Sequence, residues 1–218
     1  MMKAIILSLP REAERRRRIR GILDSYFDIS IFDAVDGRSD HNSSLFENYE
    51  FKSKFRNRDI SRVEKACSLS HFLLNTQTTP QTNYIVFEDD VSGYNRELLE
   101  VFLFYENYSD GIYLLGGQNG LKLQKVFYFF WKVHFLVSGR LFVKLPRLFH
   151  GRIYRTCCYY IPNGPKKYFQ KLDKLSLADD WKYLAKEFSL PVFYAPIFEH
   201  PSDLSDSVIE KARSKGET

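Results

Sequence analysis

The sequence is short of cysteine, of long apolar runs and, over one stretch, of acidic residues. It has three cysteines, an odd number, and no C-x-x-C spacing. A disulfide framework or a zinc site is therefore not expected, and a reducing compartment is the simpler interpretation. No charge-free apolar run reaches the roughly 18 residues of a membrane-spanning helix. The apolar stretch near the first residue is too short for a signal peptide and no small-residue cleavage site follows it, so we expect a cytoplasmic protein.

Acidic residues are missing between Asp110 and Asp173, and this basic aromatic segment carries a charge of +11, whereas the whole chain carries +5. A surface that interleaves cations with large aromatics suits an anionic partner: a membrane leaflet, a phosphorylated glycan or nucleic acid. The sequence equally allows the aromatics to be core and the cations to be a solvated face. The cations are Lys122, Lys125, Lys132, Arg140, Lys144, Arg147, Arg152, Arg155, Lys166, Lys167 and Lys171.

Three adjacent carboxylates, Glu88, Asp89 and Asp90, follow a short apolar run at 84–87. The run is typical of a buried strand. The acids cannot continue into the core, because unpaired buried charge is too costly. At the mouth of the strand they repel one another unless a cation neutralises them, and Mg²⁺ and Mn²⁺ take oxygen ligands of this kind. The alternative is an acidic turn or helix N-terminus, where acids are favoured without a metal.

Short apolar runs alternate with helical patterns over the first 120 residues, which predicts an α/β protein with a mostly parallel central sheet and helices on both faces. Ligands of such sheets bind outside the carboxyl ends of the strands, where 88–90 and 36–37 fall. We expect strands at 3–9, 29–35, 84–87, 112–115, 155–161 and 192–194, helices at 11–26, 61–75, 95–105, from about 166 and at 177–188, and a loop at 39–58.

Two further local patterns belong to this prediction. Ser61 and Glu64 have the spacing of a capping box, which places a helix start near Ser61. The basic aromatic segment shows alternating stretches that fit strands or loops. We expect one domain over residues 1–218.

Six stretches, taken in order, resemble glycosyltransferase family 25, and in particular its lipooligosaccharide β-galactosyltransferases. The resemblance covers residues 1–91 and 154–210, whereas 118–153 match no motif. The stretches are Ile6–Leu9 with Arg15–Arg18, Phe32–Gly37, Glu64–His71, Phe87–Val91, Tyr159–Lys167 and Ala178–Trp181.

The resemblance implies a GT-A-like fold, with 1–120 holding the nucleotide sugar and 121–218 the acceptor. It implies an inverting transfer of galactose from UDP-galactose to a lipooligosaccharide or lipopolysaccharide core, with Mn²⁺ or Mg²⁺ as cofactor. UDP-glucose or a UDP-N-acetylhexosamine are alternative donors. A non-catalytic protein that binds a membrane or nucleic acid through the basic segment is a further alternative, although no nucleic-acid-binding motif is visible.

Candidate metal ligands come from the acidic triplet and from the end of the chain. Alternate side chains of an extended stretch share a face, so Glu88 and Asp90 are paired like a D-x-D motif, and Asp89 points the other way and is structural. We expect Asp90 to bind the metal and Glu88 to contact ribose or metal-bound water. By resemblance, His200 is the third metal ligand; the alternative is a surface histidine.

An inverting transfer needs one carboxylate base on the acceptor side, and Asp179 and Asp180 are the candidates. We favour Asp180; N-capping by Asp179 is the competing role. The remaining candidates would meet the UDP-sugar, in part by resemblance. They are Ser8, Arg15, Arg18, Asp36, Gly37, Glu64, Ser70, His71, Gly116 and Gly117. We expect the basic aromatic segment to dock the enzyme on the inner face of the cytoplasmic membrane or to meet phosphorylated core sugar.

Overall fold

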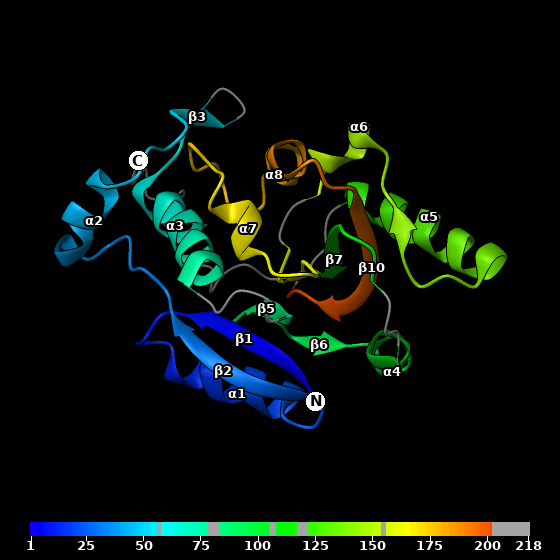
Figure 1. Ribbon diagram of the computed structural model, residues 1–218. Coiled ribbons are helices and arrows are strands. Elements are labelled where there is room, and N and C mark those ends of the chain that lie inside the picture. The colour runs from blue at the N-terminus through cyan, green and yellow to red at the C-terminus, as the bar shows by residue number, and fades with distance from the viewer. Residues whose placement is uncertain (56–57, 78–82, 105–107, 117–121, 154–155, 202–218) are drawn as a thin grey trace.

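The central sheet brings the two halves of the sequence together (Figure 1). The computed structural model describes residues 1–55, 58–77, 83–104, 108–116, 122–153 and 156–201, and of 122–124 the backbone only. Within these ranges the sheet has eight strands. In sheet order they are β2 (Phe27–Asp33), β1 (Met2–Ser8), β5 (Tyr84–Glu88), β9 (Cys158–Tyr160), β7 (Ile112–Gly116), β10 (Val192–Glu199) and β6 (Gly93–Tyr94), with β8 (Val143–Lys144) also paired to β10.

Strand direction changes in the middle of this sheet. Strands β2, β1 and β5 are parallel, and β7 is parallel to β10. Strand β9 lies between these groups and is antiparallel to both of its neighbours, while β6 and β8 are antiparallel to β10. The prediction of an α/β protein is confirmed. The sheet is mixed, so the expected mostly parallel arrangement is not confirmed, because a strand from the second half separates β5 from β7.

Helices lie on both sides of the sheet. Figure 1 shows α1 on one side of β1 and β2, and α3, α7 and α8 on the other side. The helix bounds are α1 (Ala13–Leu23), α2 (Ser43–Glu47), α3 (Arg62–Gln77), α4 (Arg96–Phe104), α5 (Lys122–Ser138), α6 (Arg147–His150), α7 (Lys166–Phe169) and α8 (Trp181–Phe188), with a 3₁₀ turn η1 (Asp40–Asn42). No helix within the described ranges has both the length and the apolarity that crossing a bilayer requires.

The start of α3 confirms the capping-box prediction. The Ser61 Oγ accepts a hydrogen bond from the Glu64 amide at 3.3 Å, and the Glu64 Oε2 accepts one from the Ser61 amide at 3.0 Å. Both side chains are buried. The carboxylate is also bound by the guanidinium of Arg58, from the short hairpin of β3 (Lys54–Phe55) and β4 (Arg58–Asp59). Glu64 therefore fixes the beginning of α3 and holds this hairpin against it.

The apolar run at 84–87 is the buried strand that the sequence predicts. These four side chains are at most 2% exposed, and the Phe87 ring packs edge-on against Phe27 and Phe198. Burial decreases at Glu88, where the strand ends. The three carboxylates therefore begin where the core stops, at the carboxyl end of β5.

Two segments differ from the sequence prediction. The expected loop at 39–58 contains η1, α2 and the β3–β4 hairpin. The prediction of strands or loops in the basic aromatic segment is wrong for 122–138, which form the helix α5. Large apolar side chains occupy both the buried and the exposed side of this helix, so a one-sided helical period is hidden in its sequence.

Candidate active site at the carboxyl ends of β5 and β10

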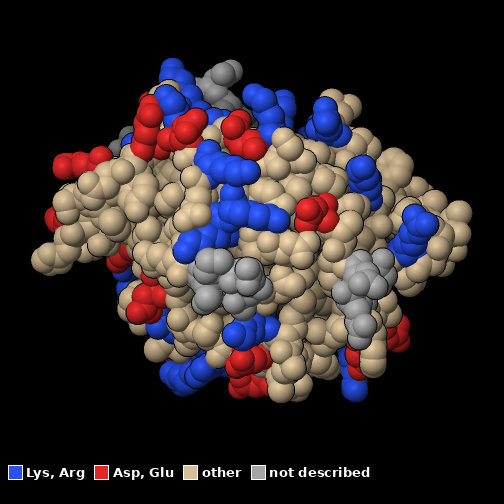
Figure 2. Space-filling view, viewed as in Figure 1, with Lys and Arg blue, Asp and Glu red and all other residues tan. Residues whose placement is uncertain are grey.

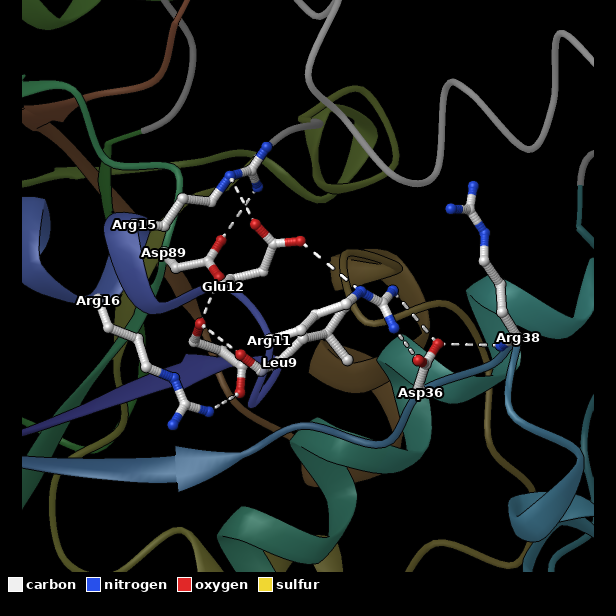
Figure 3. A network of polar contacts seen from close by, with 9 residues as sticks. Leu9, Arg11, Glu12, Arg15, Arg16, Asp36, Arg38 and Asp89 are labelled. Atoms are coloured by element: carbon white, nitrogen blue, oxygen red, sulfur yellow. Dashed lines mark hydrogen bonds and ion pairs between the residues drawn. The ribbon is translucent and has the colours of Figure 1, made fainter.

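The three adjacent acids make separate contacts. Asp89 faces the end of β1 and helix α1: its Oδ2 accepts from the Ser8 hydroxyl at 2.5 Å and its Oδ1 from the Arg15 guanidinium at 3.3 Å (Figure 3). The Arg18 guanidinium also donates to the Asp89 carbonyl oxygen at 3.3 Å. Burial raises the pKa of Asp89, while Ser8 and Arg15 act in the opposite direction. Asp89 therefore holds Ser8, Arg15 and Arg18, which the sequence analysis predicts to contact the UDP-sugar, next to the three carboxylates.

Asp90 contacts His200, which follows β10. The His200 Nε2 lies 2.9 Å from the Asp90 Oδ2, and the histidine side chain is only 10% exposed. Burial opposes the charged imidazolium, but the hydrogen-bonded carboxylate outweighs it, so the pKa of His200 is raised. The other Asp90 oxygen, Oδ1, is buried and has no hydrogen-bond partner among the described residues. Two predicted metal ligands are therefore neighbours.

Glu88 lies beside His71 on α3. The His71 Nε2 is 3.4 Å from the Glu88 Oε1, and the Nδ1 is 3.1 Å from the Tyr159 hydroxyl. Burial lowers the pKa of His71 to about 4, so the ring is neutral at pH 7. The Tyr159 hydroxyl accepts from the Asn75 amide at 2.7 Å, which leaves its own proton for Nδ1. We therefore assign the His71 proton to Nε2, on the side of Glu88.

The two candidate bases have different surroundings. Asp180 caps α8: its Oδ1 accepts from the Tyr183 amide at 3.2 Å, and its Oδ2 accepts from the Ser176 hydroxyl at 2.5 Å. The Lys52 ammonium lies 3.8 Å from the same Oδ2. Burial and then Asp90 raise the pKa of Glu88, and the charge of Asp179 adds to this rise. The N-cap of α8 is thus Asp180, whereas the charge of Asp179 contributes to the raised pKa of Glu88.

Other predicted site residues lie around the ends of β1, β2 and β7. Asp36 is paired with Arg11 and accepts from the Arg38 amide at 3.0 Å (Figure 3). Gly37 packs so closely on α3 that a Cβ would lie 2.7 Å from the Val63 Cα. Ser70 accepts from the Val35 amide at 2.8 Å and so joins α3 to the chain leaving β2.

Gly116 and Glu64 make structural contacts. A Cβ on Gly116 would lie 2.1 Å from the Phe198 carbonyl oxygen, so this glycine allows β7 to approach β10. Gly117 lies outside the described residues. Glu64 is committed to the capping box and Arg58. The structure thus brings Glu88, Asp90, His200, His71 and Asp179 into one neighbourhood, and leaves Glu64, Ser70 and Gly116 with structural contacts.

The sequence analysis did not name Arg11, Tyr159 or Asn75 as site residues, although Tyr159 begins one of the family-like stretches. Arg11 follows β1 directly, a position from which a side chain can reach the neighbouring strand end, and that placement was a usable signal. Tyr159 and Asn75 are joined only through the antiparallel insertion of β9 next to β5. Nothing in the local sequence indicates that pairing.

A basic pocket lies beside Asp180. Lys52 and Lys54 line it from the segment before α3, and Arg152 and Lys182 line it from the second half of the chain. The Lys52 ammonium also sits 3.5 Å above the centre of the Tyr183 ring. An anionic or polyhydroxylated molecule would find cations and one carboxylate in this pocket.

The candidate metal ligands that lie in contact form a pair, Asp90 and His200. Among the residues that the structure describes, no three His, Cys, Asp or Glu side chains stand together in the arrangement of a metal site. Asp90 and His200 are in contact, and Glu88 is two positions before Asp90 in the chain. The partnerless Oδ1 of Asp90 and the donor types of this pair fit a divalent cation.

The comparison with protein families identifies the class. Residues 1–181 of this 218-residue chain match the family described as Glycosyltransferase family 25 (LPS biosynthesis protein). The chain belongs to glycosyltransferase family 25. This membership supports the interpretation that the protein is a glycosyltransferase of lipopolysaccharide biosynthesis. The matched range includes Asp179 and Asp180 and ends before His200. No curated protein matches the chain.

Proposed function

We propose that the protein is an inverting, metal-dependent glycosyltransferase that moves a hexose from a UDP-sugar, in the first place galactose from UDP-galactose, onto a lipooligosaccharide or lipopolysaccharide core. Family membership supports sugar transfer and a saccharide acceptor. The observation that carries the proposal is the contact of Asp90 with His200, next to Glu88, at the carboxyl ends of β5 and β10. Ligands of α/β sheets bind at this edge.

Asp90 and His200 would hold the cation, with Glu88 turned to it or to ribose. Carboxylate ligands suit Mg²⁺ and Mn²⁺, and the nitrogen ligand favours Mn²⁺, because Mg²⁺ prefers an all-oxygen shell. When bound, such an ion neutralises charge on the leaving diphosphate. The pairing of His200 with Asp90 holds both side chains at one place, and the buried Oδ1 of Asp90 supplies a lone pair that no described group uses.

Asp179 is the better candidate for the base. The Asp180 carboxylate already accepts from Ser176 and from the Tyr183 amide, so it is held as the N-cap. Asp179 is half-buried and acts electrostatically on Glu88 and His71. A carboxylate there would accept the proton of the acceptor hydroxyl as the new glycosidic bond forms.

The arginine-rich start of α1 would meet the nucleotide. Arg15 and Arg18 are held at the acidic turn through Asp89, and Arg11 through Asp36. Guanidinium groups bind phosphate in bidentate fashion, so these side chains would bind the diphosphate of the donor. The parallel order of β2, β1 and β5 supports the proposal of a GT-A fold, with 1–120 as the nucleotide-sugar half and 121–218 as the acceptor half.

The basic pocket beside Asp180 would receive the acceptor. Its lysines and arginine suit the phosphate or carboxylate groups of an acidic core saccharide. Asp180 caps α8 at the edge of this pocket and so fixes the neighbouring Asp179.

A donor screen tests the proposed function. Thermal unfolding of the purified chain is measured with UDP-galactose, UDP-glucose and UDP-N-acetylglucosamine, each with and without Mn²⁺. A donor at about 100 times its dissociation constant stabilises the native state by about 2.7 kcal/mol. We expect the largest shift with UDP-galactose and Mn²⁺ together. A larger shift with another UDP-sugar would identify that sugar, instead of galactose, as the donor. Absence of a shift with every donor would contradict sugar transfer and favour a non-catalytic binding protein.

A further inference from the structure

Helix α5 packs on the body of the protein through one apolar stripe. Phe127 and Trp131, one turn apart, are 7% and 5% exposed. The Trp131 indole donates to the Leu141 carbonyl at 2.7 Å, and the Phe127 ring meets Phe149 edge-on at 5.3 Å between centroids. This stripe accounts for the attachment of the helix, with Phe135 stacked on Trp131 at its end.

A second apolar stripe runs along the opposite side of the same helix. Its members recur at spacings of three and four residues, which places them on one face. Their exposed fractions run from 42% to 84%. They are Val126, Phe129, Phe130, Val133, Leu136 and Val137. A helix that is apolar on all sides is normally covered, and an exposed apolar patch of this size marks an interaction surface.

Two exposed lysines border the second stripe, and three further exposed cations follow α5 in the chain. Lys125 and Lys132, two turns apart, lie beside it on α5, and Arg140, Lys144 and Arg147 follow in the next elements. No acidic residue occurs between 111 and 172. In Figure 2 the end of the molecule where α5 lies is tan with blue side chains beside it. The partner of this surface should therefore be apolar and negatively charged.

We propose that the exposed stripe of α5 inserts into the interface of an anionic bilayer while the flanking lysines and arginines contact lipid phosphates. The helix has 17 residues, about 25 Å in length, and one of its faces is held by the protein, so it lies along the membrane surface. A second copy of the chain fits less well, since a symmetric contact through α5 would bring the same cations face to face. The inference adds a membrane contact to the proposed function and stands on different residues.

Vesicle flotation tests this surface without donor or acceptor present, so its failure would leave the sugar-transfer proposal untouched. The full chain is mixed with vesicles of phosphatidylglycerol and phosphatidylethanolamine, or of phosphatidylcholine alone. We expect flotation with the anionic vesicles and a marked loss with the neutral ones. Absence of flotation with anionic vesicles overturns the proposal.

Paired variants separate the apolar from the electrostatic contribution. Phe129→Ser with Leu136→Ser should lower partitioning by about tenfold or more, whereas Phe104→Ser on α4, at a side chain 84% exposed, should change nothing. Lys144→Glu with Arg147→Glu should lower binding to anionic vesicles by about tenfold or more. The matched reversal Arg17→Glu with Arg20→Glu, on α1, should leave it nearly unchanged. Equal losses in the controls would contradict a contact centred on α5.

Insertion has its own readout in the variant Phe129→Trp. The two native tryptophans are buried, at 5% and 2% exposure, so the new indole reports on the exposed stripe. We expect a blue shift of its emission on anionic vesicles and quenching by lipids brominated on their acyl chains. If the chain does not bind vesicles, and light scattering shows a dimer that Phe129→Ser with Leu136→Ser abolishes, the stripe contacts a second copy of the chain instead.

Discussion

The His200 Nε2 lies 2.9 Å from the Asp90 Oδ2, although 110 positions separate the two residues in the sequence. Asp90 follows β5 and His200 follows β10, and between these strands the sheet places β9 and β7. The contact therefore depends on the curl of the whole sheet. It joins the two strand ends at which a metal and a diphosphate are proposed to bind.

Asp90→Asn should remove the stabilisation that Mn²⁺ gives to the folded protein. An amide keeps the shape but loses the charge that favours a divalent cation. At Mn²⁺ about 100 times its dissociation constant, wild type should gain about 2.7 kcal/mol, measured as a rise in Tm, and the variant should gain little. Asp40→Asn is the control, since that side chain is 96% exposed. A Mn²⁺ shift that survives in Asp90→Asn would contradict a ligand role for this residue.

The pair Asp179→Asn and Asp180→Asn should separate base from cap. Asparagine caps a helix about as well as aspartate, so Asp180→Asn should keep both fold and most of the activity. Asp179→Asn should lower kcat by about 10²- to 10⁴-fold, the usual contribution of a general base. Asp180→Ala should cost about 1 kcal/mol of stability through loss of the cap. The reverse pattern, with activity lost in Asp180→Asn alone, would return the base to Asp180.

Asp89→Ala should destabilise the fold without removing the response to Mn²⁺. The change removes the carboxylate that accepts from the Ser8 hydroxyl and from the Arg15 guanidinium, at a cost of about 1–3 kcal/mol. Urea unfolding measures the loss. Ser8→Ala removes one of the same hydrogen bonds and should cost less. If Asp89→Ala is as stable as wild type but no longer responds to Mn²⁺, Asp89 rather than its neighbour holds the ion.

Tyr159→Phe should disturb His71 and thereby Glu88. Loss of the hydroxyl removes one of the acceptors of the Asn75 amide, which also donates to the His71 carbonyl, and removes the hydroxyl that contacts the His71 Nδ1. We expect this to destabilise the protein by about 1–3 kcal/mol. The His71 imidazole would also lose the contact with the Tyr159 hydroxyl that fixes its tautomer. ¹⁵N chemical shifts of the two ring nitrogens measure this directly, with a protonated Nε2 expected in wild type. A wild-type ring protonated at Nδ1 would contradict the assignment.

Local sequence patterns were sufficient for the elements that depend on near neighbours. The capping box of Ser61 and Glu64 spans three residues and correctly marks the start of α3. The apolar run ending at Glu88 correctly marks a buried strand with its acids at the mouth, because the cost of burying unpaired charge acts locally. The position of β9 between β5 and β7 depends on long-range pairing, which no local pattern encodes.

The sequence indicated which residues are candidates for the site, but it did not indicate what each side chain contacts. Asp179 and Asp180 are adjacent in sequence, and only the turn before α8 decides which one caps the helix. Helix α5 was missed because its exposed side is as apolar as its buried side. Both cases concern what a side chain faces, and that is set by packing between distant segments.

The most direct test of the account is UDP-galactose turnover after treatment with EDTA, followed by titration with Mn²⁺. Wild type and Asp40→Asn should lose activity in the chelator and recover it as Mn²⁺ is added, while Asp90→Asn should stay inactive at every Mn²⁺ concentration. Full turnover of the wild type in EDTA, or recovery of Asp90→Asn to the wild-type rate, would contradict a metal-dependent transfer built on the Asp90–His200 pair.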